Sequence, residues 1–314
     1  MVRLPDPSSG PSPTVFNAVV ASSRRHTLAE GPFWVAETST ILWVDIEECR
    51  VFEGRLDGDR VKESRELDFD SRVGVAVPGA DGSVLVATAD RLVVVSRDGE
   101  RREGPSIPLS GVQSRCNDGA CDSAGRFLVG TIALDDREGG ESLYRVEKDG
   151  SLTTIDSDLT ISNGLGWSPD GRLFYSTDSA AGIVWVRDYD AETGAIGSRR
   201  EHLRFVGENP DGLCVDTRGY LWVAIWGSAE VRSFTPSGEL AAIVRVPCPQ
   251  PSSVAFVGDD RDVLLITTAR RDLSESEQVQ YPDAGRLFLA HVGAAGTPRF
   301  AWSGSWQGAP RGEK

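Results

Sequence analysis

The sequence predicts an all-β protein folded as a six-bladed β-propeller. A short apolar, β-rich run recurs six times, at start-to-start spacings of 43, 43, 46, 48 and 42 residues. The six runs are ILWVDI from Ile41, VLVATA from Val84, FLVGTI from Phe127, LFYSTD from Leu173, LWVAIW from Leu221 and VLLITT from Val263. A repeat of this length, in which every unit is rich in strands, is typical of a propeller.

Each repeat holds at least three expected strands. A second β-rich run follows every first one, and these second runs start at positions 50, 91, 142, 182, 230 and 285. A short apolar segment precedes each first run. Four of the first runs follow a turn such as Pro169-Asp170-Gly171, where a hairpin needs residues that tolerate positive φ. No window of about 11 residues between the strands has a convincing helical period, which argues against a βαβ fold. A β-helix has shorter repeats and two β-sandwiches would not repeat, so the propeller is favoured.

A propeller is a closed ring, so we expect a single domain over residues 14–302. The segment from Thr14 to Ala21 has the composition of a strand and is expected to join the last blade, which closes the ring and removes exposed edges. Residues 1–13, with four prolines, are expected to form a flexible N-terminal tail, and residues 303–314 a polar C-terminal tail. The stretch from Arg271 to Ala284 lacks a strand pattern and is expected to be a loop or short helix beside the channel mouth.

The composition excludes several classes of function. The formal net charge is −14 and no basic cluster is present, which disfavours nucleic acid and membrane surfaces as partners. No apolar run approaches the roughly 20 residues that span a bilayer, and the N-terminus has no apolar signal core, so we expect a cytoplasmic protein. The five cysteines form no C-x-x-C pair and the three histidines no H-x-x-x-H pair, so neither a zinc site nor a disulfide framework is expected. Carboxylates and amides remain as the candidate reactive groups.

A second repeated column lies in the segments that precede the six runs. Its members, at spacings of 43, 45, 45, 48 and 41 residues, are Glu30, Val73, Asp118, Asn163, Asp211 and Ser252. Five of the six present an oxygen, and four of those five are followed by glycine, which lets the backbone approach a ligand closely. Equivalent residues on the innermost strands of successive blades lie around one axis, so we expect these side chains to converge there.

This convergence predicts a cation site. Three carboxylates and an amide around one axis repel one another unless a cation lies between them. Oxygen ligands without His or Cys favour Ca²⁺, Mg²⁺ or Mn²⁺ over Zn²⁺. An acid or amide followed by glycine is also a common turn signal, and Asp118 in particular could hold its own turn through backbone amides. We favour the cation site because the acid and amide residues share one phase of the repeat.

Four strings along the chain carry a family resemblance. They are AEGPFW, SRCNDGACDSAGRFLVGTI, ISNGLGWSPDGRLFYSTDS and NPDGLCVDTRGYLWVAIWG, in that order, and the similarity extends from about residue 28 to about residue 290. With these strings the chain resembles the regucalcin/gluconolactonase (senescence marker protein) family. The resemblance implies a six-bladed propeller with one divalent cation in its central channel, and an enzyme that hydrolyses sugar lactones.

The resemblance also implies roles for individual residues. The metal ligands would be three members of the column of oxygen-bearing residues: Glu30, Asn163 and Asp211. Substrate contacts fall on Arg115 and Asn117 in the string SRCNDG, and the general base is Asp211. Some members of the family carry a glutamate that contacts the sugar soon after G-T-[MI]. That position is Asp135 in this chain, one methylene shorter.

The expected reaction is the hydrolysis of a sugar lactone to the aldonic acid. A bound cation polarises the lactone carbonyl and positions water, and Asp211 accepts the proton of that water. Ca²⁺ is the expected cation, with Zn²⁺, Mg²⁺ and Mn²⁺ as alternatives, and the partner is a small sugar lactone. The oligomeric state is left open.

Two other functions remain as alternatives. One is a calcium-binding or regulatory propeller without turnover, and the other is a related calcium-dependent esterase or organophosphate hydrolase. The string SRCND favours the enzyme, because a protein that only binds metal has no need for contacts to sugar hydroxyls.

Overall fold

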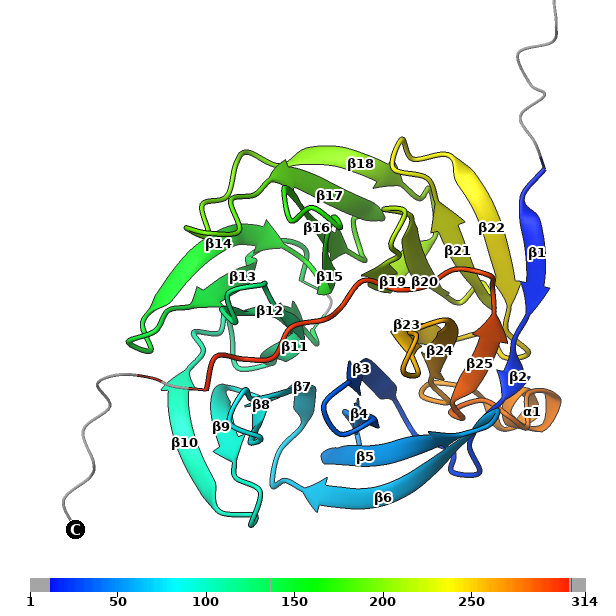
Figure 1. Cartoon of the computed structure of the whole chain (residues 1–314), viewed down its shortest axis with the longest axis horizontal. Coiled ribbons are helices and arrows are strands. Elements are labelled where there is room, and N and C mark those ends of the chain that lie inside the picture. Colours follow the sequence, from blue (N-terminus) through cyan, green and yellow to red (C-terminus); the bar gives the residue numbers. More distant parts are fainter. Residues whose placement is uncertain (1–11, 136, 305, 307–314) are drawn as a thin grey trace, which may run out of the picture.

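Six antiparallel sheets stand as blades in a ring around a central axis (Figure 1). The computed structural model describes residues 12–135, 137–304 and 306. Blade 1 consists of β3 (Ala29–Val35), β4 (Thr40–Asp45), β5 (Arg50–Asp57) and β6 (Arg60–Asp68). Blade 2 consists of β7 (Val73–Pro78), β8 (Val84–Thr88), β9 (Arg91–Val95) and β10 (Arg101–Ser106). Blade 3 consists of β11 (Ser114–Cys121), β12 (Phe127–Ala133), β13 (Glu141–Val146) and β14 (Leu152–Leu159).

Blades 4 to 6 complete the ring. Blade 4 consists of β15 (Ser162–Trp167), β16 (Leu173–Asp178), β17 (Ile183–Asp188) and β18 (Arg200–Arg204). Blade 5 contains β19 (Asn209–Val215), β20 (Leu221–Trp226), β21 (Glu230–Phe234) and β22 (Leu240–Arg245). Blade 6 contains β23 (Pro251–Val257), β24 (Val263–Thr268) and β25 (Phe288–His291), and its fourth strand comes from the N-terminus. The six apolar runs of the sequence repeat are the second strands of the six blades. The predicted fold is therefore confirmed.

The N-terminal segment closes the ring between the last two blades. The expected single strand from Thr14 to Ala21 is two strands, β1 (Thr14–Asn17) and β2 (Val19–Val20). β2 pairs antiparallel with β25 and becomes the outer strand of blade 6, whereas β1 pairs parallel with β22 and adds a fifth strand to blade 5. Both outer edges are therefore covered by a distant part of the chain, which joins the two ends of the ring.

The first strand of every blade lies innermost, and the six inner strands β3, β7, β11, β15, β19 and β23 contact one another in a closed ring around the axis. We call the face at which the inner strands begin the N-side face, and the face at which they end the C-side face. Apolar side chains fill the space between neighbouring blades. The buried Trp43 and Phe52 of blade 1, for example, share one cluster with Leu265 and Leu289 of blade 6. Each such side chain contributes about 1.5–3 kcal/mol when it is fully buried.

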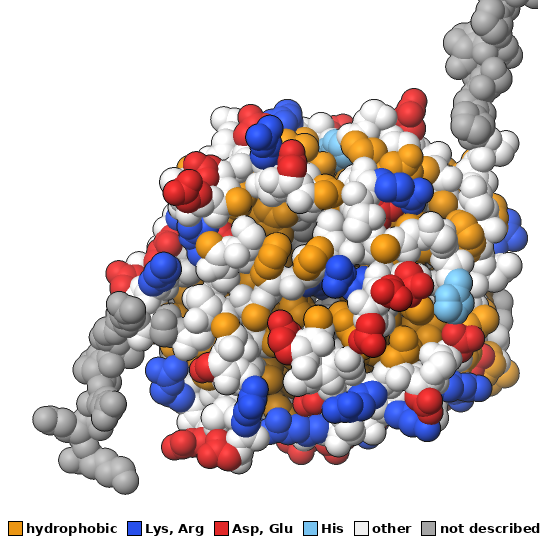
Figure 2. All heavy atoms as spheres, viewed as in Figure 1, with side chains coloured by type: hydrophobic (Ala, Val, Ile, Leu, Met, Phe, Trp, Pro, Cys, Tyr) orange, Lys and Arg blue, Asp and Glu red, His pale blue; other side chains and the backbone are white. Residues whose placement is uncertain are grey.

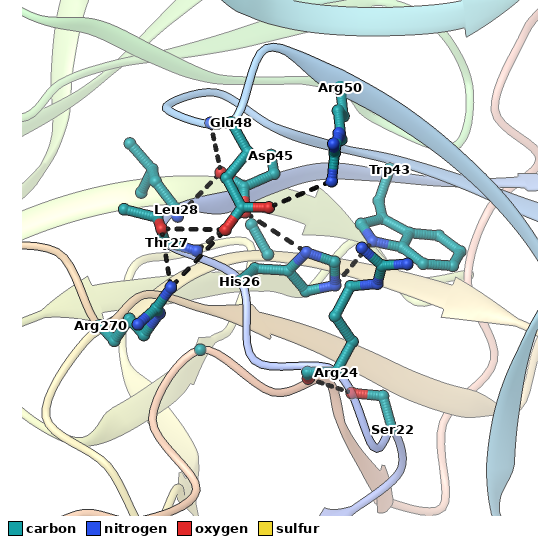
Figure 3. A network of polar contacts seen from close by, with 12 residues as sticks. Ser22, Arg24, His26, Thr27, Leu28, Trp43, Asp45, Glu48, Arg50 and Arg270 are labelled. Atoms are coloured by element: carbon teal, nitrogen blue, oxygen red, sulfur yellow. Dashed lines mark hydrogen bonds and ion pairs between the residues drawn. The ribbon is translucent and has the colours of Figure 1, made fainter. Parts of the chain in front are cut away.

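Buried aspartates at the ends of second strands hold the loops of the N-side face. In blade 1 the Asp45 carboxylate accepts the N–H groups of Thr27 at 2.8 Å, Leu28 at 3.2 Å and Glu48 at 3.1 Å (Figure 3). His26 lies beside it, with Nδ1 3.4 Å from Asp45 Oδ2. In blade 4, Asp178 accepts two backbone N–H groups in the same way. These carboxylates replace ladder bonds that the chain loses where it turns into the next strand.

After β24 the chain forms a short helix, α1 (Glu275–Gln280), which begins with a capping box at Ser274. It lies within the stretch from Arg271 to Ala284, for which the sequence predicts a loop or short helix. After β25 the chain crosses the C-side face as a strap, residues 293–303, over the middle of the ring (Figure 1). Within the described part of the chain, no helix is long and apolar enough to span a membrane.

The strap ends in two packed tryptophans. Trp302 and Trp306 are buried, and their ring centroids are 4.9 Å apart. Trp306 falls in the expected polar tail of residues 303–314, and it packs against Gly104 of blade 2 and Gly150 of blade 3. Residues 305 and 307–314 of that tail, and residues 1–11 of the expected N-terminal tail, lie outside the described residues.

Candidate active site

The repeated column of oxygen-bearing residues coincides with a break in strand register. The pairing between the inner strand and the second strand shifts in all six blades. The shifts fall between Glu30 and Phe33, Val73 and Val75, Cys116 and Gly119, Asn163 and Leu165, Pro210 and Leu213, and Pro251 and Ser253. Such bulges redirect side chains out of the regular alternation. The column residues lie at or beside these breaks near the starts of the inner strands, which places them at the N-side end of the channel.

Glycines after the column residues allow the inner strands to approach one another. A Cβ on Gly164 would lie 2.5 Å from the backbone oxygen of Asp211 in the next blade. Gly164 also has φ +33°, a conformation that side chains disfavour. A Cβ on Gly212 would lie 2.7 Å from the Cα of Ser253. The acid- or amide-glycine pairs of the repeat are therefore needed for the close packing of blades 4, 5 and 6 around the site.

Glu30 and Asp211 place two carboxylates in the channel, and neither has a cationic hydrogen-bond partner within the part of the chain that the structure describes. Both residues are buried, and burial raises the pKa of each carboxyl well above its ordinary value. Repulsion from Asp211 and Asp118 raises the pKa of Glu30 further, and repulsion from Asp118 does the same for Asp211. Glu30 Oε2 accepts only the Gly31 N–H at 3.0 Å among the described residues. Asp211 Oδ1 is buried without a hydrogen-bond partner in the same part of the chain.

A chain of hydrogen bonds connects the predicted substrate residues with the third predicted ligand. Arg115 Nη1 donates to Asn117 Oδ1 at 2.7 Å, and Asn117 Nδ2 donates to Asn163 Oδ1 at 2.7 Å. Asn163 Nδ2 then donates to the Ser179 hydroxyl at 2.9 Å. The donors fix the orientation of both amides, so that the oxygen of Asn163 accepts from Asn117 and keeps a second lone pair. β11 and β15 thus bring Arg115, Asn117 and Asn163 together, as the sequence predicts for one site.

Arg115 is held in a crowded basic environment. It is only 3% exposed, and its Nε has no hydrogen-bond partner among the described residues. Burial lowers the pKa of Arg115 to about 10; Arg271 and Arg72 lower it too, while Glu47 and Glu30 act in the opposite direction. Arg115 and Arg72 line the same cavity of about 420 Å³ between blades 2 and 3. A guanidinium with an unused donor beside a cavity is suited to bind a polar ligand.

Two further predicted residues lie apart from this chain of contacts. Asp135 is exposed, and both of its oxygens accept from Arg137 Nε, at 2.7 and 2.9 Å. Arg137 in turn donates to the hydroxyl of Ser114 at 2.9 Å, beside Arg115. Asp118 Oδ1 accepts the backbone N–H of Gly119 at 2.7 Å. A bond of this kind is what we expect if Asp118 holds its own turn. The structure therefore does not bring Asp135 into direct contact with Arg115 or Asn117.

Three residues at the mouth of the site have no counterpart in the sequence predictions. Glu47 lies on the loop after β4, and Arg72 Nη2 contacts its carboxylate at 2.8 Å. Arg271, on the loop after β24, contacts the other oxygen of Glu47 at 3.3 Å. These loops belong to blades 1, 2 and 6 and carry no repeated signal, so only the closed ring brings them together.

The donor set fits a divalent cation that prefers oxygen. Glu30, Asn163 and Asp211 offer two carboxylates and an amide oxygen, and Asp211 Oδ1 has no hydrogen-bond partner among the described residues. In the described part of the chain, His, Cys, Asp and Glu side chains form no group of three or more that could hold a metal ion. The predicted set of metal ligands contains only two carboxylates, so it needs the amide oxygen of Asn163 as the third ligand.

Comparisons with known proteins agree with the fold. The family model described as SMP-30/gluconolactonase/LRE-like region matches residues 28–270. The pentonolactonase XacC of Haloferax volcanii is 35% identical over 91% of this chain and 97% of that protein. The L-arabinolactonase of Azospirillum brasilense is 33% identical over 94% of this chain and 97% of that protein. The crystal structure of a calcium-binding protein, regucalcin, from Agrobacterium tumefaciens has a TM-score of 0.84 and 27% identity, and covers 92% of this chain and 98% of that one.

Proposed function

The chain belongs to the SMP-30/gluconolactonase/LRE-like family, and from this premise we propose that it is an enzyme that hydrolyses a sugar lactone to the aldonic acid with a divalent cation in its central channel. One observation carries the proposal. Two buried carboxylates, Glu30 and Asp211, have no cationic hydrogen-bond partner among the described residues. They share the channel with an amide that is hydrogen-bonded through Asn117 to Arg115. The lactonases among its relatives support a sugar lactone as the substrate.

Glu30, Asn163 and Asp211 would hold the cation. Ca²⁺ is the first candidate, because all three donors are oxygens and a structural relative is described as calcium-binding. Mg²⁺, Mn²⁺ and Zn²⁺ are the alternatives. When bound, the cation supplies Lewis acidity toward the lactone carbonyl and neutralises the two carboxylates.

In the proposed reaction, Asp211 acts as the general base. The oxygen of a water molecule forms a bond to the lactone carbonyl carbon, and Asp211 accepts the proton that this water loses. The bond between the carbonyl carbon and the ring oxygen then breaks, and the ring oxygen takes up the proton that Asp211 had accepted, which gives the hydroxyl of the open aldonic acid and restores the Asp211 carboxylate. The unpartnered Oδ1 of Asp211 is available to accept that proton. Its role as a metal ligand lowers its basicity, so the two roles compete.

Arg115 and Asn117 would bind and orient the lactone. The unused Nε of Arg115 donates to a ring hydroxyl or to the carbonyl oxygen, where negative charge develops. Asn117, held between Arg115 and Asn163, fixes the distance between substrate and ligand residues. Asp135 would contact the sugar only after it leaves Arg137, and Asp118 is the alternative base.

A calcium-binding propeller without turnover is the second candidate function, and the description of the regucalcin relative favours it. The two functions differ in what Arg115 does. A binder gains nothing from an arginine that is desolvated and only partly hydrogen-bonded beside the channel, whereas an enzyme uses it on the substrate. A calcium-dependent esterase or organophosphate hydrolase would be identified by its substrate preference.

The test is a series of hydrolysis rates on a panel of aldonolactones, with pentonolactones and hexonolactones, simple esters and an organophosphate. Each rate is measured with chelator and again after cation is restored. We expect hydrolysis of at least one aldonolactone that chelator abolishes and Ca²⁺ or another divalent ion restores. Glu30→Gln should first weaken cation binding and regain part of its activity in excess cation. Cation binding without hydrolysis of any panel member would reject the enzyme in favour of the binder.

A further inference from the structure

Two cavities adjoin at the mouth of the candidate active site. The cavity of about 420 Å³ between blades 2 and 3 is lined by Arg115 and Arg72. A second cavity, of about 480 Å³, lies between loops of blades 1, 2 and 6 and is lined by Arg72, Arg270 and Arg271. Arg72, on the loop between β6 and β7, lines both, so the two cavities meet at this side chain. A ligand bound beside Arg115 is therefore within reach of Arg72.

The walls of these two cavities are basic, although the chain as a whole has a formal net charge of −14. Among the described residues, the lining side chains include four arginines and two carboxylates, Glu47 and Asp272. The cavity that contains Arg115 has two of these arginines and neither carboxylate. On the opposite, C-side face, Lys and Arg side chains are interspersed with Asp and Glu side chains around the rim (Figure 2). The arginines are thus concentrated where a substrate would enter the channel.

Local ion pairs leave part of this positive charge unmatched. Nε and Nη2 of Arg72 both contact the same oxygen of Glu47, each at 2.8 Å. The other oxygen of Glu47 lies 3.3 Å from Arg271 Nη1, so two guanidinium groups share this carboxylate. Asp272 contacts Arg271 Nε at 3.1 Å from an exposed position. Arg115 has no carboxylate within 4.0 Å among the described residues. Three guanidinium groups therefore have two carboxylates between them.

An unmatched charge of this kind favours an anionic ligand. Burial lowers the pKa of Arg115 to about 10, and the charges of Arg271 and Arg72 lower it as well, whereas Glu47 and Glu30 raise it. The Nε of Arg115 is buried and donates to no described residue. An anionic oxygen at this N–H would satisfy the donor and relieve the repulsion among the arginines. A neutral sugar hydroxyl would satisfy the donor only.

We propose that the substrate is a lactone with an anionic group, a carboxylate or a phosphate, which binds between Arg115 and Arg72 while the lactone carbonyl lies at the cation site. This inference rests on the proposed function, because it assumes a lactone hydrolase in which Arg115 contacts the substrate. Arg72 is the added specificity residue, and Glu47 holds its guanidinium from the side of the second cavity. The lactone of an aldaric acid and a phosphorylated aldonolactone are the two sources of such an anion.

A purely structural role for Arg72 makes a different prediction. In that case the residue only fastens the loop that carries Glu47, and its loss lowers the hydrolysis of every lactone equally. Arg270 offers a matched control, because it lines the second cavity but not the cavity of Arg115. Its Nη2 lies 3.6 Å from Glu48, so its charge is paired (Figure 3). Arg72→Gln and Arg270→Gln therefore remove the same charge, one beside Arg115 and the other away from it.

The experiment uses three lactones of one hexose with the same ring size: the neutral aldonolactone, the aldarolactone, and the aldonolactone with a terminal phosphate. For each, kcat/KM is measured with the full chain at a fixed, saturating concentration of the cation that supports hydrolysis. We expect wild type to prefer at least one anionic lactone to the neutral one by about 10- to 100-fold, the size of one or two hydrogen bonds between charged groups. Arg72→Gln should lower this ratio about 10-fold, mainly through KM, and Arg270→Gln should leave it within about twofold. The wild-type ratio should also fall between about 0.05 and 0.5 M NaCl, because salt screens the attraction.

The outcomes separate this inference from the proposed function. If wild type hydrolyses a neutral lactone at least as efficiently as both anionic ones, the inference is overturned and the proposed function stands. An equal loss for all three lactones in Arg72→Gln, or the same fall of the ratio in Arg270→Gln, overturns the role of Arg72 in specificity. A wild-type chain that hydrolyses no lactone at all overturns both. If Arg72→Gln does not fold, Arg72→Lys replaces it, with a smaller fall of the ratio, because the charge stays and the planar fork is lost.

Discussion

Two buried aspartates in this propeller differ in how their oxygens are used. Asp45 in blade 1 is fully buried, and its carboxylate accepts three backbone N–H groups and lies beside His26 (Figure 3). Asp211 in blade 5 is buried almost as completely, yet its Oδ1 has no partner among the described residues. Both arise from the same repeat and lie on the same face of the ring. Their hydrogen-bond partners and the charges of their neighbours distinguish them.

The pKa shifts record this difference. Burial raises the pKa of both carboxyl groups, but the neighbouring His26 and the hydrogen bonds from the backbone of Glu48 and Thr27 reverse the shift in Asp45 and bring its pKa below the ordinary value. The backbone of Gly212 lowers the pKa of Asp211, but burial and the charge of Asp118 outweigh it, so that this pKa remains well above its ordinary value. A carboxylate that the protein itself satisfies stabilises the fold. A carboxylate that the protein leaves unsatisfied is available for a ligand or for catalysis.

The largest effect that this comparison predicts is on catalysis by Asp211→Asn. The amide keeps the size and one ligand oxygen but cannot accept the proton of water. We expect kcat to fall by about 10² to 10⁴, the range for a lost general base, and to stay low at saturating cation. The measurement is kcat against cation concentration with the best aldonolactone. Full recovery at saturation would make Asp211 a ligand only and would move the base to Asp118.

The matched substitution at the other aspartate acts on stability. Asp45→Asn replaces one acceptor oxygen by a donor and leaves buried N–H groups at Thr27, Leu28 or Glu48 without a partner. We expect the free energy of unfolding in urea to fall by about 2–3 kcal/mol, while kcat per folded molecule stays at the wild-type value. If Asp45→Asn has the stability of wild type and a reduced kcat, a carboxylate whose hydrogen bonds are satisfied by the protein does not have to be a structural one.

The sequence predicts the parts of the molecule that repeat. The six runs locate the second strands, and the column from Glu30 to Ser252 locates the bulges of the inner strands, because equivalent positions in a repeat occupy equivalent places in the ring. The strap carries no repeat, and Arg299 contacts Pro32 and Phe33 of blade 1 only because the chain crosses the closed ring. The contact of Glu47 with Arg72 and Arg271 likewise depends on loops from three blades. Asp135 follows the family string, but the sequence gives no sign that Arg137 holds it.

A pair of buried arginines extends the comparison to positive charge. Arg187 is paired with Asp156 at 2.7 Å, whereas Arg115 has no carboxylate within 4.0 Å among the described residues. We expect Arg115→Ala to lower kcat/KM about 10- to 100-fold, the size of lost hydrogen bonds from a charged donor, and to leave cation affinity unchanged. Arg187→Ala should lower stability and leave kcat/KM unchanged. Calorimetry with Ca²⁺, steady-state kinetics and urea unfolding on both variants make the distinction. Full lactonase activity in Arg115→Ala would remove this residue from the site.

The smallest predicted effect is a pH dependence of opposite sign for the two aspartates, in the presence of chelator. A carboxyl whose pKa is raised by folding binds more protons in the folded chain, so the stability that it contributes falls as pH rises above its ordinary value of about 3.9. Asp211 and Glu30 are of this kind. Asp45 has a lowered pKa, so its contribution is present above that ordinary value and is lost as pH falls through its folded pKa. In chelator, Asp211→Asn should therefore be more stable than wild type at about pH 8, by about 1 kcal/mol, and the gain should shrink toward about pH 5. Asp45→Asn should be less stable than wild type at both values.

Adding Ca²⁺ should reverse the order for Asp211→Asn, because wild type then gains binding energy that the variant partly lacks. The measurement is the free energy of unfolding in urea at the two pH values. If Asp211→Asn is less stable than wild type in chelator at the higher pH, Asp211 is not a carboxylate that the fold leaves unsatisfied for the cation.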